Sequence, residues 1–137
     1  MIYQGNRITV SLLDDGIANM QYNAEGESVN KFDAETNKQF DEAVTALEQA
    51  DNVKGLIVTS SKGVFIAGAD ITEFVSHFNK EEEEIKNWIV EINGVFSRFE
   101  DLPFPKVAAI NGAALGGGCE MTLVCEYRVM SEKAQIG

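Results

Sequence analysis

The fold of this chain is decided by the stretch Lys106-Val-Ala-Ala-Ile-Asn-Gly-Ala-Ala-Leu-Gly-Gly-Gly-Cys-Glu120. Its first five residues, 106–110, are a short apolar run that predicts a buried strand. Three consecutive glycines then let another group approach the backbone closely, and the apolar run 119–125 predicts a short helix behind them. N–H groups at the start of a helix can bind an oxyanion, and Glu120 in the first turn can transfer a proton. This order of elements indicates a ligand site on an α/β fold.

A second loop of the same form lies upstream. Gly55-Leu-Ile-Val-Thr59 predicts another buried strand, and the loop after it contains Phe65-Ile-Ala-Gly-Ala-Asp70, whose acidic residue opens the next helix. Two such loops can supply two N–H donors to one carbonyl oxygen. Close packing of a helix on a strand explains the glycine run equally well when that run is considered alone. The second loop and Glu120 together favour a functional site.

The remaining segments continue the alternation of strands and helices. Residues 8–13 and 17–22 predict a β-hairpin, because Asp14-Asp15-Gly16 between them has tight-turn chemistry. Asp33 is placed as the N-cap of a helix over 34–49, and residues 127–130 predict a further strand. A long helix over 81–100 is predicted from one apolar stripe, formed by Ile85, Trp88, Ile89, Ile92, Val95, Phe96 and Phe99. The pattern predicts one domain over residues 1–137.

Composition excludes several classes of function. The 137 residues carry 11 Lys and Arg against 22 Asp and Glu, a net charge of −11, and 45% are hydrophobic. This acidic globule without a basic stripe is a poor partner for nucleic acid or an anionic membrane surface. Cys119 and Cys125 lack zinc-site spacing and indicate reduced thiols. We expect no transmembrane segment and no secretory leader, and therefore a cytoplasmic location.

Other catalytic motifs are weak or missing in this sequence. The lone histidine, His77, is interpreted as a surface or partly buried helix residue, which disfavours Ser-His-Asp chemistry. The run Glu81-Glu-Glu-Glu84 suits the positive end of a helix dipole better than a metal site. Gly112 and the run 116–118 match neither a dinucleotide fingerprint nor a P-loop. We therefore expect no metal.

Two segments carry a family resemblance. Phe65-Ile-Ala-Gly-Ala-Asp-Ile71 and Ala109-Ile-Asn-Gly-Ala-Ala-Leu-Gly-Gly-Gly-Cys-Glu120 resemble, in order and separation, the two signature segments of the enoyl-CoA hydratase/isomerase (crotonase) superfamily. Residues 1–5, 26–33 and 100–105 are most similar to the hydratase/isomerase domain of multifunctional alpha subunits of bacterial fatty-acid oxidation complexes. The resemblance implies an α/β, crotonase-like spiral of β-β-α units, of which residues 1–137 are the N-terminal part.

Site residues follow from the resemblance position by position. It implies an oxyanion hole made by the N–H groups of Ala69 and Gly117, with Glu120 as the catalytic acid or base. The resemblance also implies that the substrate binds to residues of the two loops, namely Ala67, Gly68, Asp70, Ile71 and Gly116. The family's second glutamate belongs to an Ile-Gly-hydrophobic-Pro-Glu segment, of which this sequence contains Ile136-Gly137.

The implied activity is hydration of trans-2-enoyl-CoA, together with cis-3 to trans-2 isomerisation, in fatty-acid β-oxidation. The resemblance implies no cofactor in this domain; NAD would serve a separate 3-hydroxyacyl-CoA dehydrogenase domain, and a thiolase beta subunit would be the partner. Syn hydration uses two carboxylates, so residues 1–137 by themselves are expected to be hydration-deficient. Two alternatives stay open: another crotonase-type reaction on an acyl-CoA thioester, and a catalytically inactive CoA-binding or assembly fragment.

Overall fold

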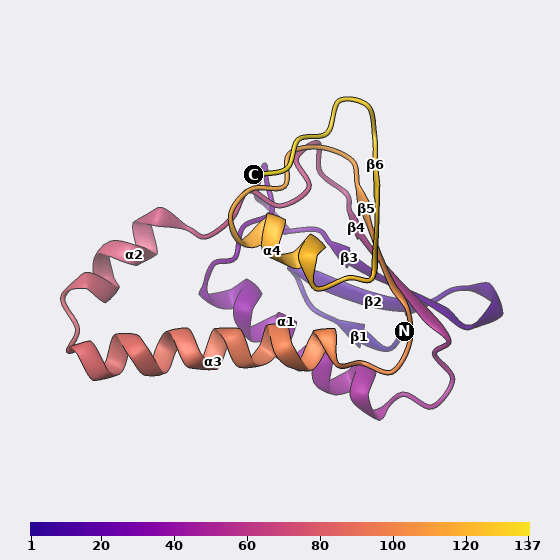
Figure 1. The fold of residues 1–137 in the computed structure, drawn as a ribbon, viewed down its shortest axis with the longest axis horizontal. Coiled ribbons are helices and arrows are strands. Elements are labelled where there is room, and N and C mark those ends of the chain that lie inside the picture. Colours follow the sequence, from indigo (N-terminus) through magenta and orange to yellow (C-terminus); the bar gives the residue numbers. More distant parts are fainter.

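Six strands form one sheet in the order in which they occur along the chain. The computed structural model describes residues 1–137. The strands are β1 (Tyr3–Gln4), β2 (Ile8–Leu12), β3 (Ile17–Tyr22), β4 (Gly55–Ser60), β5 (Lys106–Ile110) and β6 (Tyr127–Met130). The helices are α1 (Ala34–Gln49), α2 (Ile71–Phe78), α3 (Glu82–Glu100) and α4 (Gly117–Leu123). In Figure 1, α2 and the first half of α3 extend to one side as an arm, while α4 lies near the strands.

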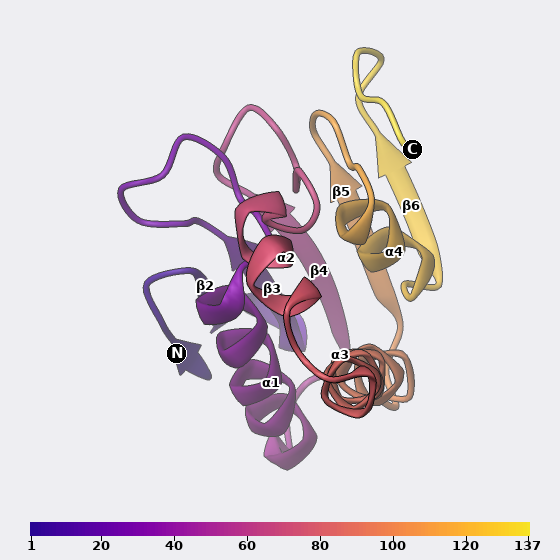
Figure 2. The ribbon, with the colours of Figure 1, turned by 90° about the vertical axis from the view of Figure 1, so that its left-hand side faces the viewer.

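Strand pairing changes from antiparallel to parallel across the sheet. The predicted hairpin is confirmed: β2 and β3 are antiparallel, joined by a 3₁₀ turn in which Asp15 has φ 63° and Gly16 has φ 81°. From β3 onward the neighbouring strands β4, β5 and β6 are all parallel. Because parallel strands end at the same edge of a sheet, the loops after β4 and β5 emerge side by side (Figure 2).

The helices mostly begin where the sequence places them. Helix α1 spans the predicted residues, and Asp33 caps it by accepting a hydrogen bond of 2.8 Å from the N–H of Thr36. Helix α3 begins at Glu82, after Glu81 as its N-cap. The helix predicted over 119–125 begins two residues earlier, at Gly117, and ends at Leu123. That boundary was wrong because the last two of the three glycines belong to the helix itself.

The core lies between the sheet and helices α1 and α3. Its aromatic part joins sheet and helices through successive ring contacts among Tyr22, Phe32, Phe40, Phe96 and Phe99. The apolar stripe of α3 is buried only toward its end, where Val95 and Phe99 reach this core, while Ile89 is 46% exposed. The first half of α3 instead packs against α2, where Trp88 contacts the rings of Phe74 and His77. None of the four helices combines the length and apolar character needed to span a membrane.

A buried lysine ties the start of β5 to the turn before β6. The Lys106 side chain is fully buried, and its Nζ donates to the carbonyl oxygens of Leu102 and Phe104 at 3.1 Å each and to Oε1 of Glu126 at 3.0 Å. The Lys106 N–H donates to the other oxygen of Glu126 at 2.8 Å. Burial raises the pKa of Glu126, but these hydrogen bonds outweigh it, and the net pKa lies below the ordinary value.

We expect Lys106→Met to lower the free energy of unfolding of this region by about 1–3 kcal/mol, because two buried carbonyls lose their donor. The difference from wild type should shrink at acid pH. A carboxylate with a lowered folded pKa stabilises the fold above its unfolded pKa, and that contribution is lost as the pH falls through the folded pKa. Hydrogen exchange of the β5 amides in the full-length protein measures the effect. Lys80→Met, at an exposed lysine, should leave their protection unchanged.

Candidate active site

The loops after β4 and β5 are hydrogen-bonded to one another. Ile66 donates its N–H to Ala113 O at 3.3 Å and accepts from the N–H of Leu115 at 3.1 Å. Gly68 has φ +101°, and a Cβ there would lie 2.9 Å from Leu115 O. A Cβ on Gly118 would overlap the Ile66 carbonyl. The two glycines are therefore required for the close approach of these loops.

The backbone N–H groups of Gly117 and Ala69 have no acceptor in the chain. Gly116 donates to Gly137 O and Gly118 to Leu115 O, both at 2.8 Å, whereas the N–H of Gly117 between them donates to no group in the chain. Gly117 is the first residue of α4, where helical N–H groups lack an intrahelical acceptor. The N–H of Ala69 is likewise without an acceptor. Both groups can therefore donate to a ligand.

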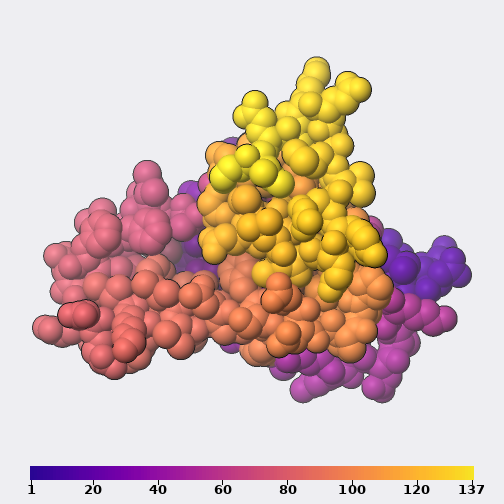
Figure 3. All heavy atoms as spheres, in the orientation of Figure 1, coloured from indigo at the N-terminus to yellow at the C-terminus, as the bar shows by residue number.

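Ala69, Gly117 and Glu120 line one cavity of about 250 Å³. In Figure 3 the surface is hollowed between the arm of α2 and α3 and the end of the chain that carries α4. The rest of the lining is mainly aromatic and aliphatic: Phe32, Phe74, Trp88, Ile89, Ile92 and Phe96, with Asn37 and Asn93. The cavity therefore suits an apolar ligand with a single polar group held near the two N–H donors.

Glu120 stands in the first turn of α4, three residues after Gly117. Its side chain is exposed, and none of the ion pairs of the chain involves it. Its backbone is fixed, because its N–H donates to Gly116 O at 3.0 Å. A carboxylate that lines a cavity and makes no ion pair can accept a proton from a bound molecule.

The five other predicted site residues lie around the cavity but outside its lining. Ala67 and Gly68 hold the first loop: Ala67 donates to Asn30 O at 2.8 Å, and Gly68 O accepts from Phe32 at 2.7 Å. Ile71 is 75% exposed, and Gly116 is exposed at the start of α4. Contact of these residues with a substrate stays a prediction.

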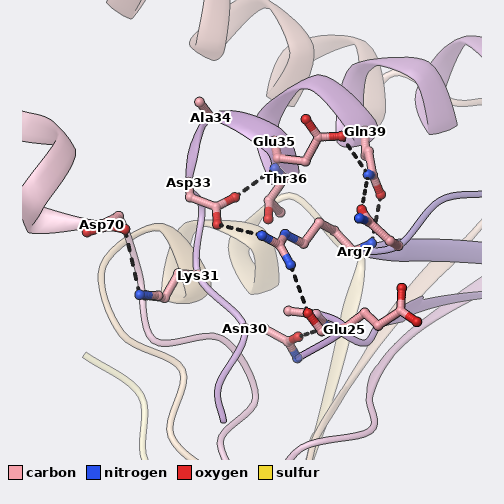
Figure 4. A network of polar contacts seen from close by, with 12 residues as sticks. Arg7, Glu25, Asn30, Lys31, Asp33, Ala34, Glu35, Thr36, Gln39 and Asp70 are labelled. Atoms are coloured by element: carbon pink, nitrogen blue, oxygen red, sulfur yellow. Dashed lines mark hydrogen bonds and ion pairs between the residues drawn. The ribbon is translucent and has the colours of Figure 1, made fainter. Parts of the chain in front are cut away.

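Asp70 has a structural role at the start of α2. Its Oδ1 accepts hydrogen bonds from the N–H of Thr72 at 3.0 Å and from the Thr72 hydroxyl at 2.6 Å. Oδ2 lies 3.6 Å from Nζ of Lys31 (Figure 4). The hydrogen bonds from Thr72, with a smaller contribution from Lys31, lower the pKa of Asp70. The carboxylate therefore caps the helix that forms one wall beside the cavity.

The aromatic wall of the cavity was not predicted as part of the site. Trp88 and Phe96 were assigned only to the apolar stripe of α3, and that periodicity does not say which residues face a cavity. His77 is confirmed as a partly buried helix residue, and its ring stacks on Trp88 with centroids 3.9 Å apart. No group of three or more His, Cys, Asp and Glu side chains is arranged to hold a metal ion.

Known proteins match this chain in sequence and in fold. The fatty acid oxidation complex subunit alpha of Psychrobacter sp. strain PRwf-1 is 92% identical over 137 residues, which are 100% of this chain and 19% of that protein. The protein of the same name from Acinetobacter baumannii strain AYE is 55% identical over 137 residues, which are also 100% of this chain and 19% of that protein. The chain thus spans 19% of the length of these curated relatives.

A solved structure confirms the predicted crotonase-like α/β fold. The enoyl-CoA hydratase from Bacillus anthracis has a TM-score of 0.82 and 30% sequence identity to this chain, covering 96% of it and 50% of that protein. The sequence profile described as enoyl-CoA hydratase/isomerase matches residues 13–137. The chain belongs to the enoyl-CoA hydratase/isomerase family.

Proposed function

We propose that this chain is the N-terminal portion of a fatty acid oxidation complex alpha subunit, and that its cavity hydrates trans-2-enoyl-CoA to 3-hydroxyacyl-CoA. One observation carries the proposal. The unpartnered N–H groups of Ala69 and Gly117 belong to residues that line the same cavity as the carboxylate of Glu120. Two donors for one oxygen and a nearby acid or base are what hydration of an unsaturated thioester requires.

The chemistry follows from charge development in the thioester. The two N–H groups donate to the thioester oxygen, which gains negative charge as water adds to C3. Glu120 acts on a proton, either taking it from the attacking water or delivering one to C2, and a second carboxylate performs the other transfer. For isomerisation of cis-3 to trans-2 enoyl-CoA, Glu120 takes a proton from C2, the same donors stabilise the resulting dienolate, and Glu120 returns the proton to C4.

The relatives' name supports a wider assignment. A subunit alpha of a complex implies a second subunit, and we propose a thiolase beta subunit as that partner. The remaining length of the relatives leaves room for an NAD-dependent 3-hydroxyacyl-CoA dehydrogenase, which would use the hydration product. Both cysteines are free, which supports a reducing, cytoplasmic location.

The test uses the full-length protein and crotonyl-CoA. We expect loss of the absorbance of the conjugated thioester and formation of 3-hydroxybutyryl-CoA, without release of free CoA thiol. Thiol release at the rate of absorbance loss would contradict hydration and favour thioester hydrolysis on the same oxyanion hole. No reaction, together with retained binding of acyl-CoA, would favour the inactive CoA-binding alternative.

A further inference from the structure

Phe32, just before α1, contacts both candidate donor loops. Its N–H donates to Gly68 O at 2.7 Å, and it forms a parallel bridge with Ala69. Its ring packs on the other loop: a Cβ built on Gly117 would lie 3.0 Å from Cδ2 of Phe32 and 3.6 Å from Cε2. The backbone of Phe32 thus fixes the chain at Ala69, while its side chain fixes the distance to Gly117.

The ring of Phe32 is itself held by the core. It is 7% exposed and packs against three aromatic rings: Tyr22 at 5.8 Å, Phe40 at 6.1 Å and Phe96 at 5.5 Å between centroids. Aromatic packing from the sheet, α1 and α3 leaves the ring little freedom to move. A shift of the ring would therefore move Gly117 relative to Ala69.

The backbone before Phe32 is anchored by Asn30, which is buried. The Asn30 side-chain nitrogen donates to Tyr22 O at 3.0 Å, Ser60 Oγ at 2.9 Å and Phe65 O at 3.2 Å. Its main-chain oxygen accepts from the N–H of Ala67 at 2.8 Å. Figure 4 shows Asn30 beneath the segment that leads to Asp33 and α1. Residues 30–32 thereby tie the first loop to the ends of β3 and β4.

We propose that Phe32 is a positioning residue for the reaction, setting the separation of the Ala69 and Gly117 N–H groups; this rests on the proposed function. Both donors must reach one oxygen at hydrogen-bond distance in the transition state. A displacement of about 1 Å at such a site can cost on the order of a hundredfold in rate. Phe32 also lines the cavity, so we expect a small change in binding beside a larger change in turnover that is transmitted through the two loops.

The test compares Phe32→Leu with Phe99→Leu in the full-length protein. Phe99 belongs to the same aromatic cluster and is fully buried, but it does not line the cavity. We expect Phe32→Leu to lower kcat for crotonyl-CoA hydration by about tenfold or more, with KM changed by less than about threefold. Phe99→Leu should keep kcat within about twofold of wild type. The decrease in kcat should be larger for Phe32→Ala than for Phe32→Leu. Thermal unfolding verifies that each variant is folded.

A second readout reports directly on the hydrogen bonds that the two N–H groups donate to the bound thioester. Hydrogen bonds to the carbonyl of bound cinnamoyl-CoA polarise its conjugated system and move its absorbance to longer wavelength. We expect the full shift in wild type and Phe99→Leu and a smaller shift in Phe32→Leu. The role of Phe32 would be overturned, with the proposed function intact, if Phe32→Leu kept the wild-type kcat and the wild-type absorbance shift. Equal losses of kcat and of the shift in Phe32→Leu and Phe99→Leu would overturn it too. A wild-type protein with neither shift nor hydration would overturn the proposed function, and this role with it.

Discussion

Glu120→Gln is expected to reduce hydration of crotonyl-CoA by about 10²–10⁴ while acyl-CoA binding persists, because a positioned acid or base contributes about that factor. Glutamine keeps the shape of the side chain and removes its ionisation. Glu120 lines the cavity from the first turn of α4 and makes no ion pair, so few structural contacts are lost. Steady-state hydration kinetics and calorimetric titration with a saturated acyl-CoA separate the two effects.

Glu83→Gln is the matched control for Glu120→Gln. Glu83 is exposed in the first turn of α3 and does not line the cavity, so the same loss of one charge should leave turnover unchanged. Hydration by Glu120→Gln near the wild-type rate would refute the assignment of proton transfer to Glu120. Loss of turnover in both variants would instead indicate a general effect of the protein's negative charge.

Gly117→Pro is expected to lower turnover by about 10²–10³, the cost of losing one oxyanion-hole donor. Proline is tolerated at the first position of a helix, where its missing N–H has no intrahelical acceptor in any case. Gly117 occupies that position in α4. The substitution therefore removes the donor without breaking a helical hydrogen bond.

Gly117→Ala separates the donor from the added bulk. Alanine keeps the N–H, and its Cβ makes the same close approach of 3.0 Å to Phe32 Cδ2 that proline would make. The ratio of turnover between the two variants isolates the hydrogen bond. We expect alanine to lose much less than proline, and equal losses would show that crowding against Phe32, not the N–H, limits the reaction.

The fold was largely predictable because local signals agree with one another. Strand β5 and helix α1 follow from an apolar run and from a cap at Asp33, and both features depend only on near neighbours. The start of α4 was misplaced, since a glycine run carries no helical preference of its own. Here tertiary contacts decide the boundary: Gly116 turns the chain at φ +54°, and Gly118 lies directly against the Ile66 carbonyl.

The site was predictable only in part. The parallel pairing of β4 with β5 brings the two signature loops together, and Ala69, Gly117 and Glu120 line one cavity there, while their roles stay predictions. The aromatic wall depends on how α3 crosses the sheet, which periodicity along one helix does not determine. Phe32 precedes α1 in a polar segment, and only the packed structure places its ring against a glycine more than 80 residues away. That residues 1–137 alone bind without hydrating stays a prediction.

The most direct test of the central claim is a crystal structure of the full-length protein with an acyl-CoA thioester bound. We predict the thioester oxygen within about 2.7–3.2 Å of the backbone nitrogens of both Ala69 and Gly117, with the Glu120 carboxylate beside C2 and C3 of the acyl group. A thioester oxygen bound elsewhere, or in contact with only one of these two nitrogens while the acyl group occupies the cavity, would contradict it.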